Sequence, residues 1–210
     1  MVEIAGPASA DAQAPPAKAE LILITAAALF REKGYVRATT RELGEAVGIR
    51  GPSVYYHYKT KDDILYGICV ESLRRLTEQV EATAAIENPL DRLRSLIKTH
   101  VVNILEDRDM HTTMLTELRF LTPERQRDVT QKRDAYEGII QSAIADAQRA
   151  GNVRMDIPSR QLTLALLNLL NWTIFWFRPD GALSVHGVAD LLATVFLDGL
   201  LPRPLAAPSS

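Results

Sequence analysis

The chain has 210 residues, and 47% of them are hydrophobic, which suffices for a packed core in one large or two small domains. A formal net charge of −2 gives no global sign of nucleic-acid binding, so any contact with DNA must come from a local patch. Cys69, the single cysteine, excludes an internal disulfide and has no His or Cys neighbours to complete a metal site. We therefore expect a reduced, cytoplasmic protein with no metal and no resident cofactor.

The two ends of the chain have compositions that favour disorder. Residues 1–17 are rich in Ala and Pro and lack the basic segment and apolar run of a signal peptide, so we predict a disordered arm. Residues 202–210, rich in Pro, Ala and Ser, predict a disordered tail. The longest apolar stretch, between Arg160 and Arg178, contains five Gln, Thr and Asn residues, which argues against a membrane span.

Apolar residues recur at three- and four-residue steps almost throughout, which predicts an all-α fold. We expect a three-helix head over residues 18–66 and a larger helical body over residues 67–201, with about nine helices in all. The expected helices cover 18–33, two short segments after 39, and then 61–80, 90–106, 111–121, 124–150, 158–177 and 185–200. The head holds eight Lys/Arg and six Asp/Glu, giving +2, and the remainder of the chain carries −4.

Two short helices are predicted within the head. Thr39 followed by Glu42 matches a capping box, in which each side chain bonds the other residue's backbone N–H at a helix start. Gly48 ends this helix, because glycine tolerates a positive φ. Pro52 suits the first turn of the next helix, where its missing N–H costs nothing, and Gly51 can precede it as the N-cap.

The second short helix is amphipathic. Val54 and Tyr58 can pack inward with Ile49, and the spacing predicts that Tyr55 is buried as well. The side chains expected on the outer face are those of Ser53, Tyr56 and His57. Two short helices joined by a tight glycine turn form a helix-turn-helix, in which the second helix enters the major groove of DNA.

A further helix start follows at Thr60, whose side chain can cap it while two aspartates in the first turn suit the helix dipole. Lys61 is then placed to reach a phosphate oxygen beside the free backbone N–H groups. Arg50, at the entrance to the preceding helix, can pair with a guanine, but phosphate contact is an equal alternative.

Three segments of the head carry a family resemblance: AAALFREKGY at 26–35, Thr39-Thr40, and SVYYHYKTK at 53–61. Together they resemble the N-terminal signature of TetR-family regulators. The resemblance implies a homodimeric DNA-binding protein, usually a repressor, that binds a palindromic operator in double-stranded DNA and carries an inducer site in its C-terminal helices. Carried over by position, the implied DNA contacts are Thr40, Arg41, Arg50, Gly51, Ser53, Tyr56, His57 and Lys61.

The last two predicted helices, 158–177 and 185–200, are the most apolar in the chain. Either they are buried in the body or they form a dimer interface. In the resembled family the last two helices build a four-helix interface with the partner subunit. Two recognition helices about 34–36 Å apart can then occupy successive major grooves.

Aromatic and methionine side chains in the body can line an apolar effector cavity, and a cation beside them can hold an anionic group, although a core role remains open for each. The candidates are Met110, Met114, Arg119, Phe120, Trp172, Phe175, Trp176 and Arg178. Residues 172–184 are similar to the same region of TetR-family repressors of fatty-acid and sterol degradation, which implies an acyl-CoA-type inducer. A neutral or cationic drug-like hydrophobic ligand is the alternative.

Two other classes of function remain open. An enzyme would need acid/base groups or metal ligands such as His100, His111 and His186. However, the sequence holds no His-x-x-x-His, Cys-x-x-Cys, Gly-rich phosphate loop or Gly-x-Ser-x-Gly, and Asp107 with His111 is predicted to form a surface pair at i, i+4. We therefore assign no catalytic residue. A helical adaptor whose head makes only protein contacts is the third class.

Overall fold

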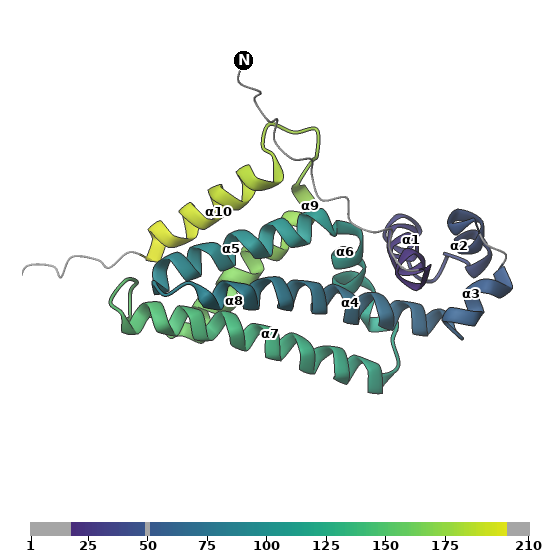
Figure 1. The fold of residues 1–210 in the computed structure, drawn as a ribbon, viewed down its shortest axis with the longest axis horizontal. Helices are drawn as coiled ribbons and strands as arrows, with labels where there is room; N and C mark the ends of the chain where they lie inside the picture. Colours follow the sequence, from purple (N-terminus) through teal and green to yellow (C-terminus); the bar gives the residue numbers. More distant parts are fainter. Residues whose placement is uncertain (1–17, 49–50, 201–210) are drawn as a thin grey trace, which may run out of the picture.

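The computed structural model describes residues 18–48 and 51–200, so the predicted arm and tail and residues 49–50 lie outside the described residues, as do the side chains of residues 51–53. The described part contains helices and no strand, which confirms the predicted all-α class (Figure 1). The helices are α1 (Lys18–Lys33), α2 (Thr40–Val47), α3 (Gly51–His57), α4 (Lys61–Glu81), η1 (Ala82–Ala85), α5 (Pro89–Glu106), α6 (Arg108–Glu117), η2 (Leu118–Phe120), α7 (Pro123–Arg149), α8 (Ser159–Asn171), α9 (Thr173–Trp176) and α10 (Val185–Leu200). Within these ranges, no helix is both long and apolar enough to cross a membrane.

Helices α1 to α3 form the head at one end of the molecule (Figure 1). Helix α1 ends as predicted at Gly34, whose φ of 80° is left-handed and whose N–H donates to the Phe30 carbonyl at 2.8 Å. Ile22, Leu43 and Val54, one from each helix, are completely or almost completely buried. The three helices therefore share one small core.

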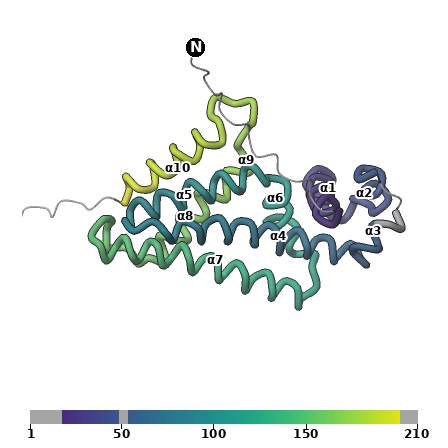
Figure 2. The backbone as a smooth tube through the Cα atoms, in the orientation of Figure 1, coloured from purple at the N-terminus to yellow at the C-terminus, as the bar shows by residue number. Residues whose placement is uncertain are grey.

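Helix α4 joins the head to the body as one continuous helix of 21 residues, and the predicted boundary between residues 66 and 67 falls inside it (Figure 2). Its first half contributes Ile64 and Ile68 to the core of the head. Met110 and Met114 of α6 belong to the same core. Because the head and body share buried side chains, a movement of α6 changes the packing of the head directly.

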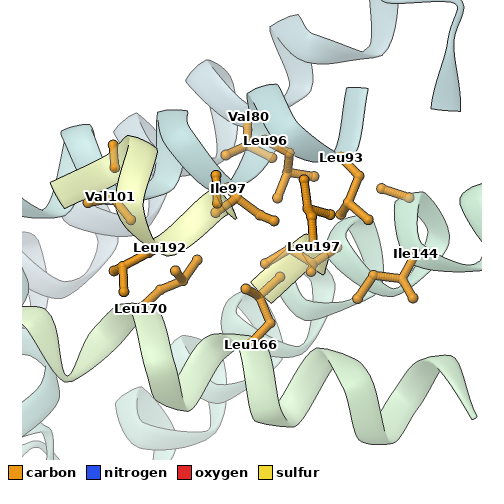
Figure 3. Packing of buried hydrophobic residues seen from close by; sticks show 14 of the residues in the cluster. Val80, Leu93, Leu96, Ile97, Val101, Ile144, Leu166, Leu170, Leu192 and Leu197 are labelled. Atoms are coloured by element: carbon orange, nitrogen blue, oxygen red, sulfur yellow. The ribbon is translucent and has the colours of Figure 1, made fainter. Parts of the chain in front are cut away.

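The body packs around a second core (Figure 3). Helix α5 lies at its centre and supplies the fully or almost fully buried Leu96 and Ile97. They belong to one cluster with Ile144 of α7, Leu166 of α8 and Leu197 of α10. These helices surround α5, and their outer faces remain available for other contacts.

The predicted helix over residues 158–177 is interrupted at Trp172 and forms α8 and α9 instead. The Phe175 N–H donates to the Trp172 carbonyl at 3.2 Å, a bond three residues back that tightens the turn. The buried Thr173 hydroxyl also donates to the Leu170 carbonyl at 2.7 Å, so it competes with the helical bonds. The three- and four-residue spacing of apolar residues does not reveal this competition between side-chain and backbone hydrogen bonds.

Candidate nucleic-acid interface and effector region

Helix α2 begins with the predicted capping box. The Glu42 N–H donates to the Thr39 hydroxyl at 3.2 Å, and the Thr39 N–H donates to the Glu42 carboxylate at 2.9 Å. Lys33 adds an ion pair at 2.8 Å, and together Lys33 and Thr39 lower the pKa of Glu42 to about 2. At the other end Gly48 has a φ of 73°, as predicted, so α2 is fixed at both ends.

Helix α3 begins at Gly51 and keeps Val54 completely buried. Tyr58 is half-buried, and its hydroxyl donates to the Ala19 carbonyl at 3.4 Å. Arg50, one of the predicted DNA contacts, and Ile49, the predicted inward partner, lie outside the described residues. For Gly51 and Ser53 the structure gives the helical backbone only.

The outer side of α3 presents aromatic side chains to solvent. Tyr56 is 88% exposed, and its ring meets that of the exposed His57 edge-on at 5.4 Å between centroids. The prediction that Tyr55 is buried was wrong, because 47% of Tyr55 is exposed. Its hydroxyl instead lies 2.9 Å from the Thr40 hydroxyl on α2. Tyr55 follows Val54 by one residue, about 100° around the helix, so its ring lies beside the core.

Like Thr40, the predicted DNA contacts Arg41 and Lys61 already have partners within the head. Arg41 is highly exposed and pairs with Glu45 at 2.9 Å. The Lys61 ammonium donates to the carbonyl of Tyr35 and, at 3.3 Å, to that of Val36, and it lies 4.4 Å from the Tyr35 ring centroid. Lys61 thus holds the loop between α1 and α2, and its partial burial lowers the pKa of the ammonium.

The eight predicted effector residues do not come together. Met110 and Met114 are buried in the core shared by head and body, whereas Phe120 stacks on Tyr35 at 5.5 Å between ring centroids and has the Arg119 guanidinium 4.9 Å from its own centroid. The remaining four are exposed residues on and after α8, namely Trp172, Phe175, Trp176 and Arg178. Of all eight, Met114 borders a described cavity.

That cavity carries polar residues that the sequence prediction did not assign to effector binding. Nε2 of His100 and Nε2 of His111 both lie 3.2 Å from the side-chain oxygen Oδ1 of Asn171. The Tyr136 hydroxyl lies 2.5 Å from His100 Nδ1, and the Ser72 hydroxyl 3.4 Å from His111 Nδ1. No motif marks this cluster, because its members come from five different helices.

The predicted surface pair between Asp107 and His111 was wrong. His111 is 2% exposed, whereas the Asp107 carboxylate accepts from Arg75 at 2.9 Å. Asp107 lies at the junction of α5 and α6 with φ −97° and ψ 36°, outside the regular helix, so the i, i+4 relation does not bring the side chains together.

Helix α6 connects the polar cluster to the head. His111 reaches inward from this helix, whereas the Thr113 hydroxyl donates to the Ala27 carbonyl of α1 at 3.0 Å. Asp109 pairs with Arg31 of α1, and the Glu117 carboxylate accepts from a backbone N–H of the loop after α1 at 3.2 Å. A change around His111 can therefore alter the position of α1 relative to α6.

A capped α2 that ends at a left-handed Gly48, and an α3 with an exposed outer face on a helical body, define a helix-turn-helix transcription regulator. Comparison with known families agrees: residues 22–67 match "Bacterial regulatory proteins, tetR family", and residues 87–200 match "Tetracyclin repressor-like, C-terminal domain". The chain belongs to the TetR family and is a ligand-responsive transcriptional repressor of that type. The matched families and relatives are regulators, not enzymes.

Individual relatives give the same assignment. The chain is 27% identical over 190 residues to the HTH-type transcriptional repressor KstR2 of Rhodococcus jostii, covering 85% of this chain and 89% of that protein. Among solved structures, the TetR family regulator PfmR from Thermus thermophilus is 31% identical with a TM-score of 0.79, over 87% of this chain and 99% of PfmR. AibR in complex with isovaleryl coenzyme A and operator DNA has the same fold, with 24% identity and a TM-score of 0.76 over 90% of this chain and 100% of AibR.

Proposed function

We propose that this repressor is a homodimer that binds a palindromic operator through its head and leaves it when a hydrophobic or acyl-CoA-type inducer binds the body. The observation that carries the proposal is the outer side of α3, where Tyr56 and His57 are exposed while Val54 anchors the helix. Such a face is free to enter the major groove.

The proposed DNA contacts are Thr40, Arg41, Arg50, Gly51, Ser53, Tyr56, His57 and Lys61. Tyr56 can contact DNA without any rearrangement of the head, because almost all of its side chain is exposed. Arg41 has to exchange its exposed ion pair with Glu45 for a phosphate, and exposed pairs contribute little to stability. Lys61 supports the same face by fixing the loop after α1.

A homodimer is supported by apolar side chains on the outer faces of α8 and α10. Leu164 and Trp172 are 44% and 64% exposed on α8 and at its end, and Leu191 and Val195 are 45% and 55% exposed on α10. Each pair lies at four- or eight-residue spacing, so each forms a stripe along its helix. An isologous pairing of these faces buries both stripes and places two heads on one operator.

An inducer in the body is supported by α6, which connects the polar cluster to α1. The architecture has a precedent in AibR, which was solved with isovaleryl coenzyme A and operator DNA. An acyl-CoA-type inducer for this chain follows from the resemblance of residues 172–184, and a drug-like hydrophobic compound is the second candidate. A coupling of about 1–3 kcal/mol changes operator affinity roughly 5- to 150-fold.

The operator and the dimer are tested together by selection from a random DNA pool. We expect enrichment of a palindrome with two half-sites, and loss of binding to it by Tyr56→Ala but not by Met155→Ala, which shortens another highly exposed side chain far from the head. Enrichment of one unrepeated half-site contradicts the homodimer. No enrichment contradicts the operator and favours a head that contacts proteins.

The inducer is tested on the selected complex by adding isovaleryl-CoA, palmitoyl-CoA or the lipophilic cation tetraphenylphosphonium. Release of the DNA by either thioester, but not by free coenzyme A, supports the acyl-CoA class. Release by tetraphenylphosphonium alone favours the drug-like class of inducer. Retention of the DNA with all three contradicts both classes of inducer.

A further inference from the structure

A groove of about 520 Å³ runs along the outside of the body between α4 and α7, a volume in the range of small-molecule sites. Its apolar lining consists of Val70, Leu73, Ala135, Tyr136 and Ile139. The two cations at its rim already have partners, since Arg74 pairs with Glu78 at 2.6 Å and Lys132 pairs with Asp128 at 2.6 Å. The groove therefore suits an apolar molecule better than an anionic one.

A smaller cavity of about 60 Å³ lies deeper, among α4 to α8. It has room for about four water-sized groups, enough for the end of a chain molecule. Leu76, Met114 and Leu167 provide apolar walls, and His100 and Asn171 provide polar ones. The cavity thus combines apolar walls, a cluster of hydrogen-bonding groups and charged residues of α7 along one side.

With Asn171 Oδ1 facing both rings, the hydrogen bonds assign the proton of each histidine to one nitrogen. Asn171 Oδ1 can only accept, so both histidines must donate to it from Nε2. Both rings are neutral at pH 7, because burial lowers the pKa of His100 to about 3 and that of His111 to about 4. Each Nδ1 is therefore an acceptor, and Nδ1 of His100 receives the Tyr136 hydroxyl at 2.5 Å.

Tyr136 separates the two spaces. Its side chain lines both the groove and the inner cavity, as Leu73 does, and it is 4% exposed. A rotation of the Tyr136 ring would join the groove to the cavity and break the bond to His100. The Nδ1 acceptor would then be buried without a donor, a state that is unfavourable.

We propose that the groove and the inner cavity form one effector site for an elongated, uncharged molecule whose inner end is a hydroxyl group that replaces the Tyr136 hydroxyl on His100. A ligand hydroxyl donates to His100 Nδ1 in place of the Tyr136 hydroxyl, which moves away when its ring rotates. A ketone or carboxylate only accepts, so it leaves Nδ1 unsatisfied. This inference rests on the proposed inducer response only for its effect on DNA, since binding itself is measured on the protein alone. Of the two proposed inducer classes, it favours the uncharged hydrophobic compound over an acyl-CoA, which carries charged phosphates.

The charges around the cavity agree with an uncharged ligand. One cation, Arg133, and two carboxylates, Asp134 and Glu137, lie at its α7 side, so no excess positive charge is available among the described lining residues. A carboxylate drawn inside would lose its hydration and meet lining charges that sum to a negative value, which is costly.

The test compares three ten-carbon probes, 1-decanol, 2-decanone and decanoate, by isothermal titration calorimetry at pH 7.5. We expect 1-decanol to bind at least fivefold more tightly than 2-decanone, with decanoate weakest. Histidine ring signals in NMR spectra of the full chain locate the site, and the His100 ring should shift with 1-decanol. Equal affinities for the three probes, or an unperturbed His100 ring, overturn the proposal.

The matched variants are Tyr136→Phe and Tyr66→Phe. Both remove one hydroxyl from the α4–α7 pair, but Tyr66 donates to Asp128 at 2.8 Å and lines neither space. We expect Tyr136→Phe to bind 1-decanol at least fivefold more tightly, because Nδ1 of His100 has lost its donor, and Tyr66→Phe to change less than twofold. An unchanged or lower affinity of Tyr136→Phe overturns the proposal. Operator binding without ligand, measured separately, shows whether the variants are folded and whether the proposed function itself fails.

Discussion

In the head, the ion pairs of Glu42 with Lys33 and of Arg41 with Glu45 are exposed and join residues nine and four positions apart in the sequence. In the body, the almost fully buried His100 and its partner Asn171 are 71 residues apart. Exposed ion pairs are screened by salt, whereas buried neutral groups respond to protons. The head should therefore be sensitive to ionic strength and the body to acid.

The largest effect is expected from acid acting on the body. The pKa of both buried histidines lies below the unfolded value of about 6.5, so below pH 6.5 the unfolded chain binds more protons than the folded one. Stability is therefore lost as the pH falls from 6.5 towards 4. Each histidine lowers the free energy of unfolding by about 1.4 kcal/mol per pH unit, which gives a loss of about 5 kcal/mol for the pair between pH 6.5 and 4.5. Urea unfolding across this range measures the loss.

His111→Asn and His186→Gln sharpen this prediction. His111→Asn removes a buried ring. Burial and Arg133 lower the pKa of this ring, whereas Asn171 and Asp107 raise it. His186→Gln removes an exposed ring. His111→Asn should start less stable but flatten the pH slope by about 1.4 kcal/mol per unit, whereas His186→Gln should keep the wild-type slope. Identical slopes for all three proteins would contradict the assignment of acid sensitivity to the body.

The second effect is the response of the head to salt. If a dimer neutralises six phosphates, operator affinity falls about 10³-fold between 50 and 200 mM salt, with a log–log slope near −5. Arg41→Gln removes two contacts per dimer and should reduce the slope by about 2, whereas Arg127→Gln, at an exposed ion pair of α7, should not change it. A salt-independent affinity would contradict the phosphate contacts.

The sequence predicted the head well because its signals are local. The capping partners Thr39 and Glu42 are three residues apart, and Gly34 and Gly48 mark helix ends through their own backbone freedom. Tyr55 was mispredicted for the same reason. Its spacing resembles that of core residues, but whether it is covered depends on α2, which the α3 sequence does not encode.

In the body, the helices were predictable and their interior contacts were not. Apolar periodicity locates α5 and α7, but it does not specify that His100 meets Tyr136 across 36 residues. The predicted effector residues were chosen for their type, and aromatic side chains such as Trp172 turned out to be on the surface. Their distribution depends on how the helices pack, which single-helix patterns do not determine.

The third prediction concerns the stability of the head. Thr39→Ala removes the hydroxyl that accepts from the Glu42 N–H and should destabilise the protein by about 1 kcal/mol. Thr39→Ser keeps the hydroxyl and should recover most of this loss. Urea unfolding at pH 7 measures both variants. A loss shared equally by Thr39→Ser would show that the methyl group, and not the cap, is responsible.

The smallest effect is expected for Tyr55→Phe, which removes the contact with the Thr40 hydroxyl across the two short helices. Both groups are exposed, so water can replace the lost bond, and the free energy of unfolding should change by less than about 0.5 kcal/mol. The same substitution frees the Thr40 hydroxyl for DNA, so operator affinity should be retained within about twofold. A loss of stability above about 1.5 kcal/mol would mean that Tyr55 is a structural link between α2 and α3. The head would then depend on a side-chain contact between helices in the way the body does, and the contrast between the two regions would narrow.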